Sequence, residues 1–299
     1  MKLTLLDRRV VRQRVGMLCV LMLGLSFALC ARAESVTSVS HAPWDQLLHA
    51  HVVDTPDGRS TSVDYAGMLA ERVKLSAYLQ SLALVKKDTF ASLSQPAQLA
   101  FLINAYNAWT VELVLTAYPD LTSIKDLGSF FRSPWSRSFI PLLEETLSLD
   151  NIEHDLIRGD NGYQEPRIHF AVNCASIGCP ALRAEAYDET RLESQLEDQT
   201  RRFLQDPSRN RPGADGLEVS SIFKWYREDF QQGWLGYSRL EDFFIHYSDA
   251  VGLTAVQVQA LRSGRLKIRF VGYDWALNQS VKESVSESVS ESVSESINP

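Results

Sequence analysis

The stretch of residues 96–115 limits the possible folds most strongly, because it is apolar on almost every side of a helix. A helix of this kind is stable in water only when other elements surround it. Ser94 stands just before the stretch, where an N-cap residue is expected. The sequence therefore predicts a central buried helix that begins near Ser94, inside a domain large enough to enclose it.

Two carboxamides, Asn104 and Asn107, interrupt this apolar stretch. They are three residues apart, so they share one face of the predicted helix. A buried carboxamide without partners costs about 1–3 kcal/mol, so both side chains need hydrogen bonds. Two interpretations stay open at this point: the side chains tie neighbouring loops to the core, or they line a functional site.

Further helices are expected around this central one. Residues 65–84 have helical periodicity, and the predicted core residues of this segment are Leu69, Val73, Leu75 and Leu79. Asp150 and Glu153 stand at capping-box spacing near the start of a third segment. The other predicted helices cover residues 44–51, 148–158, 188–204 and 221–230.

Two segments alternate between apolar and polar residues, which predicts strands. The first, residues 167–173, places Ile168, Phe170 and Val172 on one face. The second lies late in the chain, around Ile268. Helices therefore outnumber strands, and we expect an α+β fold: a single domain with a central buried helix and a mainly antiparallel sheet.

The N-terminus has the order of a secretory signal peptide: a positively charged start, an apolar run over residues 16–30, then Ala31-Arg32-Ala33. The apolar run is shorter than the roughly 20 residues that a membrane-spanning helix needs. We therefore expect cleavage after Ala33 and no stable membrane insertion afterwards. The expected location is periplasmic or secreted.

The end of the chain repeats Val-Ser-Glu-Ser, with one apolar residue in four. Such a segment buries too little surface to offset its chain entropy, so residues 279–299 are predicted to be a disordered tail. Between this tail and the signal peptide of residues 1–33, residues 34–278 form one predicted globular domain. The formal net charge of −7 becomes more negative once the basic N-terminus is removed, so nucleic acid is not an expected partner.

Residues 166–180 hold the two cysteines that remain after the predicted cleavage, Cys174 and Cys179, next to His169. In an exported protein a close cysteine pair becomes a disulfide, a set of metal ligands or a reactive thiol. A disulfide is possible if the residues between the cysteines turn, which Gly178 favours. Zinc sites use tighter cysteine spacing, and a second close pair is missing, so no metal or other cofactor is expected.

The third interpretation makes one cysteine a nucleophile, which needs a thiolate and a nearby base. If the predicted strand continued through Cys174, His169 would lie about 16 Å away and point to the opposite face. A pair of His169 and Cys174 therefore needs a sharp turn between them. Otherwise His154 is the next candidate base, or the turn brings Cys179 back toward His169. These alternatives stay open.

The chain also carries several longer motifs. They are Val63-Asp64-Tyr65, FLINAYNA at 101–108, LSLDNIEH at 147–154, RIHFAVNCAS at 167–176, Cys179-Pro180, FKWY at 223–226 followed by Asp229-Phe230, and Tyr273-Asp274-Trp275 followed by Leu277-Asn278. In this order, across about residues 40–278, they resemble the bacterial domain-of-unknown-function family 547. The resemblance indicates family membership far more specifically than it indicates an activity.

That family is in turn similar to the papain-like cysteine hydrolase group, whose sites combine a cysteine, a histidine and an orienting acid or amide. The resemblance implies a papain-like core, with Cys174 as nucleophile and His169 or His154 as base. It implies an orienting partner among Asn104, Asn107 and Asp274. The order differs from that of papain-like enzymes, which usually place the cysteine before the histidine.

We therefore expect a hydrolase or acyl transferase that acts on an amide, ester or thioester bond of a small molecule or peptide. The expected substrate contacts are Arg167, Asn173, Trp225 and Asp274. The rival interpretation is a non-enzymatic envelope protein with a binding or structural role, in which a Cys174–Cys179 disulfide is a staple. These interpretations differ in whether the two cysteines are free thiols or are joined by a disulfide.

Overall fold

Helix α6 (Gln95–Leu115) lies inside the first of two hydrophobic cores, as its apolar sequence predicts. Its N-cap is Ser94, whose hydroxyl accepts a hydrogen bond from the backbone N–H of Ala97. From Leu99 onward almost every side chain of the helix is buried. The predicted central helix is therefore confirmed, and it begins at the predicted position.

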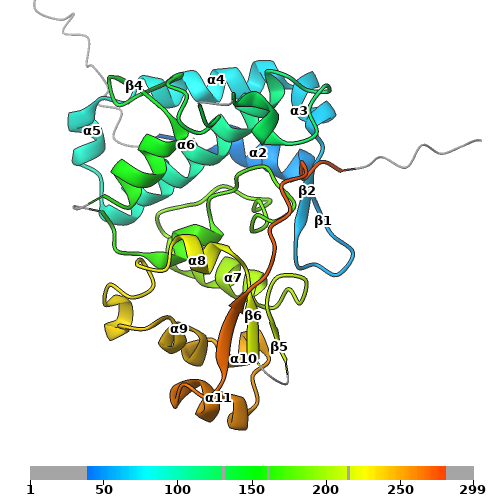
Figure 1. The fold of residues 1–299 in the computed structure, drawn as a ribbon. Helices are drawn as coiled ribbons and strands as arrows, with labels where there is room; N and C mark the ends of the chain where they lie inside the picture. The colour runs from blue at the N-terminus through cyan, green and yellow to red at the C-terminus, as the bar shows by residue number, and fades with distance from the viewer. Residues whose placement is uncertain (1–38, 130–131, 160–161, 214–215, 281–299) are drawn as a thin grey trace, which may run out of the picture. The chain divides into compact units, whose positions relative to one another are not determined.

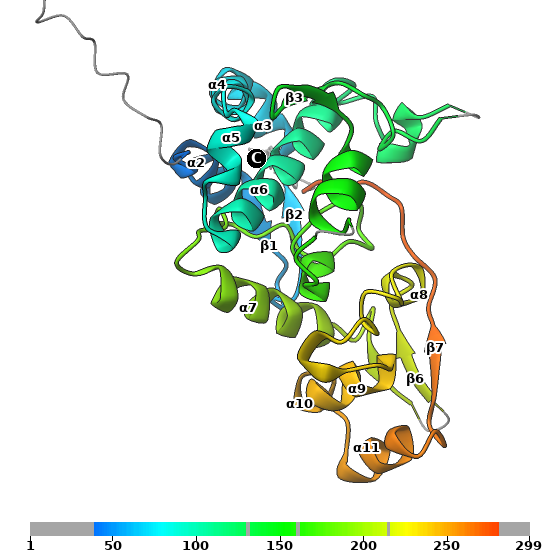
Figure 2. The same ribbon diagram turned by 90° about the vertical axis from the view of Figure 1, so that its left-hand side faces the viewer.

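The computed structural model describes residues 39–129, 132–159, 162–213 and 216–280. Helices α2–α6 gather at one end, and the later helices surround the strands β5–β7 at the other (Figures 1 and 2). Helices combined with small sheets confirm the expected α+β class. The predicted signal peptide lies outside the described residues, and so does the predicted tail apart from Gln279 and Ser280.

The first end of the molecule also holds α2 (Ala42–His51), α3 (Tyr65–Ala70), α4 (Arg72–Ala83) and α5 (Lys87–Ala91). Leu75 and Leu79 of α4 are buried, as predicted. The prediction is wrong for Leu69 and Val73, because Leu69 is 36% and Val73 84% exposed. The single helix expected over residues 65–84 is two helices on either side of Glu71, so one apolar stripe does not continue through both.

The second core is rich in phenylalanine and lies among the later elements. Its phenylalanines are Phe170, Phe203, Phe223, Phe230, Phe243 and Phe244. The helices that contribute to it are α7 (Leu192–Leu204), α8 (Ile222–Trp225), α9 (Leu240–His246), α10 (Ser248–Val251) and α11 (Ala255–Arg262), and the 3-10 turn η4 (Trp234–Gly236) packs beside it. Helix α7 joins the two cores, because Leu196 belongs to the first and Phe203 to the second.

Within the described residues, the strands form three separate small sheets where one sheet is expected, which corrects that part of the prediction. Two are antiparallel hairpins: β1 (Val52–Asp54) with β2 (Thr61–Val63), and β3 (Ile140–Leu142) with β4 (Glu145–Leu147). The third contains β5 (Arg211–Pro212), β6 (Gly216–Val219) and β7 (Lys267–Phe270), with β5 antiparallel and β7 parallel to β6. Since helices supply most of both cores, the strands only need to pair locally.

Residues 167–173 do not form the predicted strand, because Pro166–Phe170 form the 3-10 helix η3. A proline in the first turn and the Glu165 carboxylate, which accepts a backbone N–H of that turn, both favour a helix start. The alternation has another cause: Ile168 packs into the first core and Phe170 into the second. Helix η3 therefore lies between two apolar environments.

The last described segment returns from the second core to the first (Figure 1). There Leu277 forms an antiparallel bridge with Ser176, beside the cysteines. The hydroxyl of Tyr65 donates a hydrogen bond to the side-chain oxygen of Asn278 at 2.8 Å. The C-terminal segment is thereby held against the cysteine loop. The two remaining described helices are the 3-10 helix η1 (Ile124–Leu127) and the π-helix η2 (Asn151–Ile157).

Candidate functional site

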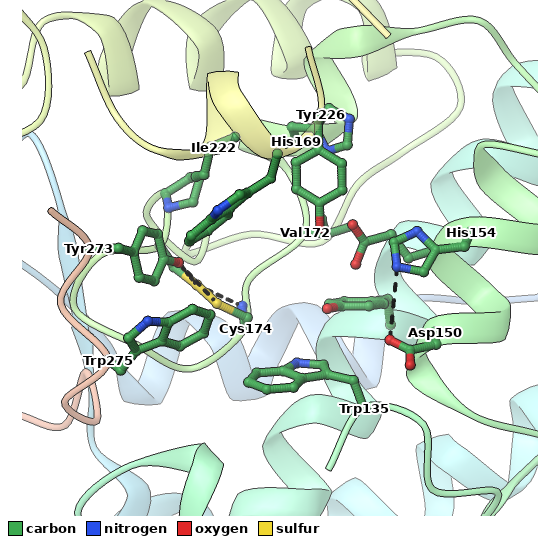
Figure 3. A pocket seen from close by; sticks show the side chains of 15 residues that line it. Trp135, Asp150, His154, His169, Val172, Cys174, Ile222, Tyr226, Tyr273 and Trp275 are labelled. Atoms are coloured by element: carbon green, nitrogen blue, oxygen red, sulfur yellow. Dashed lines mark hydrogen bonds and ion pairs between the residues drawn. A yellow bond between two sulfur atoms is a disulfide. The ribbon is translucent and has the colours of Figure 1, made fainter. Parts of the chain in front are cut away.

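A pocket of about 190 Å³ lies where the two cores meet. Val172 of the first core and Ile222 of the second both line it. The other lining residues are Tyr106, Trp135, Asp150, Glu153, His154, His169, Cys174, Cys179, Pro180, Trp225, Tyr226, Tyr273 and Trp275 (Figure 3). The fold thus brings both cysteines and both candidate histidines to one pocket.

Cys174 and Cys179 are joined by a disulfide, with their Cα atoms 6.1 Å apart. The chain turns sharply at Ala175, whose φ of 61° lies in the left-handed region. Cys174 is partly exposed, whereas Cys179 is only 2% exposed. Of the alternatives for the two cysteines, the structure contains the disulfide, and Cys174 is its accessible half.

Several hydrogen-bond donors surround the two sulfur atoms. The hydroxyl of Tyr273 lies 3.2 Å from each sulfur, and the hydroxyl of Ser176 lies 3.2 Å from Sγ of Cys174. The backbone N–H of Cys174 donates to Sγ of Cys179 at 2.9 Å. Burial raises the pKa of Tyr273 to about 12, so its hydroxyl keeps its proton. These donors would stabilise negative charge on sulfur once the disulfide opens.

His169 lies on η3, buried in the wall of the pocket. Its Nε2 makes a 2.6 Å hydrogen bond to Oδ2 of Asp229. Arg158 holds the same carboxylate through Nε at 2.6 Å and Nη2 at 3.0 Å. Tyr226 stacks on the imidazole with ring centroids 3.9 Å apart, which shields it from water. Among the described residues, Nδ1 of His169 has no hydrogen-bond partner.

The electrostatics of this pair favour a neutral imidazole beside an ionised carboxylate. Burial lowers the pKa of His169, and the hydrogen bond to Asp229 offsets only part of that shift. Burial alone would raise the pKa of Asp229, but the hydrogen bonds and charges of His169 and Arg158 hold it well below its usual range. Asp229 therefore accepts a hydrogen bond from Nε2–H, which keeps its proton, and Nδ1 keeps a free lone pair. Such a nitrogen in a pocket wall is a candidate general base.

The second candidate histidine, His154, lies on η2 on the side of the pocket away from Tyr273 (Figure 3). Its side chain is 39% exposed. Its Nδ1 makes a 2.6 Å hydrogen bond with Nη1 of Arg158, and its Nε2 lies 3.9 Å from Asp150. Because Arg158 is a donor, it occupies the Nδ1 lone pair, so His154 is a weaker candidate base than His169.

Asp150 and Glu153 do not form the expected capping box, since Asp150 makes no side-chain cap and η2 is a π-helix. Asn151 makes the local hydrogen bonds instead, because its side-chain oxygen accepts from the backbone N–H and the hydroxyl of Ser148. Both carboxylates line the pocket. Burial raises the pKa of Asp150, and Glu153 is buried.

Aromatic rings form much of the remaining wall. Trp275 lies 4.5 Å from Tyr273 and 5.7 Å from both Trp135 and Trp225, measured between ring centroids. Trp225 is 47% exposed, which is unusual for so large an apolar ring. The ammonium of Lys125 lies 3.7 Å from the centroid of the Trp275 ring. The aromatic cluster is therefore partly open to contact from outside.

Asn104 and Asn107 do not line the pocket. Asn104 exchanges two hydrogen bonds with the backbone of Tyr187, at 2.8 and 2.9 Å. Asn107 donates to the carbonyl of Ala171 at 3.0 Å and accepts from the backbone N–H of Asn173 at 2.8 Å. Of the two interpretations left open for these carboxamides, the geometry matches loop anchors, and Asn107 anchors the segment between His169 and Cys174.

Of the four expected substrate contacts, only Trp225 is among the described residues that line the pocket. Arg167 is buried and forms ion pairs with three glutamates. Asn173 is buried and bonded to the backbone of the cysteine loop. Asp274 is exposed and accepts a backbone N–H from the turn that follows it. The latter three side chains stabilise the segments around the pocket without lining it.

A family model described as "Protein of unknown function, DUF547" matches residues 90–204. Less than half of the chain is matched, so the comparison supports a similarity of this part to the DUF547 family. No curated protein and no solved structure matches the chain. The DUF547 match is narrower than the expected resemblance over residues 40–278. It includes α6, η3 and both cysteines, and it ends before the segments that carry Asp229 and Tyr273.

Asp229 is central to this site, but the sequence analysis does not predict it as a site residue. A signal was present, because Asp229 follows the FKWY motif and a histidine in a buried site needs an acceptor for its second ring nitrogen. The expected helix over residues 221–230 does not extend that far: α8 ends at Trp225, and turns place Asp229 against His169.

Within the described part of the chain, the histidine, cysteine and acidic side chains form no group that could hold a metal ion. None of its helices combines the length and the apolar composition that crossing a membrane requires.

Proposed function

We propose that the protein is a cysteine-dependent hydrolase or acyl transferase, active once the Cys174–Cys179 disulfide is reduced. One observation carries the proposal: His169 and Cys174 line one pocket, and Asp229 holds His169 with Nδ1 free of any described partner. A neutral base, an orienting carboxylate and a sulfur in one cavity are the parts that acyl transfer through cysteine needs.

The reaction would begin when the Cys174 thiol gives its proton to Nδ1 of His169. The thiolate attacks the carbonyl carbon of an amide, ester or thioester, and the carbonyl electrons move onto oxygen. When this intermediate collapses, the leaving amine, alcohol or thiol takes the proton from His169, and a thioester on Cys174 remains. Water then attacks the thioester with His169 as base, or another nucleophile does so in acyl transfer.

The neighbours of Cys174 support its role over that of Cys179. Cys174 is the accessible sulfur, while Cys179 is buried. The hydroxyls of Ser176 and Tyr273 lie within hydrogen-bond distance of Sγ of Cys174 and would stabilise a thiolate there. The backbone N–H of Cys174 donates to Sγ of Cys179 in the bridged state, and once released it would be a candidate donor to the oxyanion.

We also propose that residues 1–33 direct export to the periplasm or beyond. A disulfide persists in an oxidising compartment, so the bridge is compatible with export. The cleaved protein would then be bridged at rest, and a thiol reductant would control how much of it is active.

The second candidate is a non-enzymatic envelope protein that binds a ligand in this pocket or has a structural role. The bridge itself favours it, because a permanent disulfide leaves no thiol for catalysis. The donors that surround the sulfurs are then part of a rigid pocket wall. The two candidates differ in whether the Cys174 thiol reacts as a nucleophile once the disulfide is absent.

The test compares Cys179→Ser with Cys174→Ser. The two variants are matched, since each loses the disulfide and one sulfur. On addition of 4-nitrophenyl acetate, the proposal predicts that Cys179→Ser releases a burst of nitrophenolate and gains one acetyl group by mass spectrometry. Cys174→Ser should do neither, while melting temperatures and circular dichroism show that both are folded. Equal reactivity of the two variants, or no acetyl group on either, would favour the non-enzymatic candidate.

A further inference from the structure

We propose that the pocket binds a primary ammonium group, so that its ligand is an amine. A second statement rests on the proposed hydrolase function: the substrate carries this amine near the bond that is cleaved. The proposal comes from the charges of the wall, from its aromatic rings and from a lysine that already lies on one of those rings. None of these features is used in the proposed acyl-transfer steps.

The charged side chains that line the pocket are acidic. Asp150 and Glu153 are carboxylates, and no lysine or arginine is among the described lining residues. Among the described residues, the Asp150 carboxylate has only a long ion-pair contact of 3.9 Å with His154, and its side chain is 38% exposed. Asp150 is therefore accessible to a ligand, and no lysine or arginine in the described part of the chain forms an ion pair with it.

Arg158 lies beside this wall, with its guanidinium 4.8 Å from the centroid of the Tyr226 ring and a favourable charge interaction with Glu153. Arg158 directs Nε and Nη2 to Asp229 and Nη1 to His154, so these donors are engaged away from Asp150 and Glu153. An anionic ligand would meet the carboxylates of Asp150 and Glu153 in the wall, so the lining fits a cation better than a phosphate or a free carboxylate. A cation would gain favourable charge interactions here.

The aromatic rings favour an organic cation over a simple metal ion. Tyr106, Trp135, Trp225, Tyr226 and Trp275 all line the pocket beside the two carboxylates. The face of a tryptophan or tyrosine ring attracts an ammonium group through its quadrupole and packs against the attached methylenes. A lining of carboxylates and aromatic faces therefore fits an alkylammonium.

The protein itself supplies an example of this interaction. Lys125 of η1 places its ammonium 3.7 Å from the centroid of the Trp275 ring. Trp275 also lines the pocket, so a primary ammonium is already attracted to the same aromatic cluster. The pocket offers further rings of this cluster together with the carboxylates of Asp150 and Glu153.

The experiment measures binding to the bridged wild-type protein, in which no turnover is needed. The probes are Nα-acetyl-L-lysinamide and its Nε-acetylated form, which has the same chain but no charge. Titrations by tryptophan fluorescence and calorimetry should give about tenfold tighter binding of the charged probe. Equal affinity for the two probes, or binding of neither, would overturn the proposal.

Variants locate the binding site. Asp150→Asn keeps the shape of a half-exposed side chain, and it should reduce binding of the charged probe about tenfold without changing that of the acetylated probe. The matched control is Asp155→Asn on the same helix, because Asp155 is exposed and does not line the pocket. Unchanged binding in Asp150→Asn, or an equal loss in Asp155→Asn, would contradict the assignment.

Trp225→Leu provides a second variant that does not depend on the carboxylates. This substitution should also weaken binding of the charged probe more than binding of the acetylated probe, since it removes an aromatic face from a position that is 47% exposed. A loss that is equal for both probes would contradict recognition of the ammonium. If the charged probe binds as expected while Cys179→Ser is not acetylated, the amine site stands and the hydrolase does not.

Discussion

His169 shows at the scale of one residue how burial and pairing determine the protonation of an imidazole. Its imidazole is neutral because burial lowers its pKa, and its Nε2 proton is held by Asp229. Nδ1 is then a buried acceptor without a described partner, a state that costs about 1–3 kcal/mol in an ordinary core. A role of His169 as a base would explain why the protein keeps an unpaired Nδ1 beside the pocket in spite of this cost.

Replacement of Asp229 tests this pairing through stability. Asp229→Asn leaves Arg158 and His169 without their carboxylate, so it should lower the free energy of unfolding at pH 7 by about 3 kcal/mol. The pKa of Asp229 is depressed in the folded protein, so its contribution is present above its unfolded pKa of about 3.9 and is lost as pH falls below that value.

Urea unfolding at several pH values provides the measurement. The difference between wild type and Asp229→Asn should shrink as the solution is acidified from pH 5 toward pH 2. Asp155→Asn, on exposed surface, should stay within about 0.5 kcal/mol of wild type throughout. A difference for Asp229→Asn that does not change with pH would contradict an ionised carboxylate at this position.

Asn107 gives a second prediction at this scale. Asn107→Ala removes a donor to Ala171 and an acceptor for Asn173, which leaves buried backbone groups unpaired. We expect a loss of about 2–4 kcal/mol in the free energy of unfolding. Chemical denaturation provides the measurement. A loss below about 0.5 kcal/mol would show that Asn107 does not anchor this loop.

Helices α3 and α4 show at the scale of elements where sequence periodicity works and where it fails. The apolar stripe correctly predicts Leu75 and Leu79 as core residues of α4. It fails for Leu69 and Val73, because the pattern is read across a helix boundary that has no proline or glycine to mark it. At η3 it fails for another reason: Ile168 and its neighbours alternate between two cores, and alternation normally predicts a strand.

A pair of substitutions in α4 tests this account. Leu75→Ala should lower the free energy of unfolding by about 2–5 kcal/mol, since Leu75 is fully buried. Val73→Ala should change it by less than about 0.5 kcal/mol, since Val73 is 84% exposed. Equal losses for the two variants would mean that α4 packs with a different face than the structure gives.

The pocket is a property of the whole molecule, because no single segment contains it. Motifs in the sequence predict the cysteines and the histidines as site residues, and α6 as the centre of the fold. They do not predict that His169 meets Asp229, because that contact joins residues far apart in the chain through the junction of two cores. They also cannot show that Asn107, a prominent motif residue, binds backbone instead of ligand.

Reduction of the disulfide gives a prediction at this scale. The bridge closes a short loop, since the two cysteines are separated by five positions in the sequence. Closure of so short a loop stabilises a protein by about 2 kcal/mol. The reduced protein should therefore stay folded by circular dichroism and lose about that amount in urea unfolding. Unfolding on reduction would rule out a reduced active form.

The most direct test of the central claim is the alkylation of Cys174 by iodoacetamide in Cys179→Ser, followed by mass spectrometry from pH 6 to pH 9. The account predicts that a second change, His169→Ala, slows the reaction about tenfold or more at pH 6.5 and has little effect near pH 9, where any thiol ionises. His154→Ala in the same background should leave the rate nearly unchanged. Equal rates with and without His169 across this range would contradict a Cys174 thiolate that depends on His169.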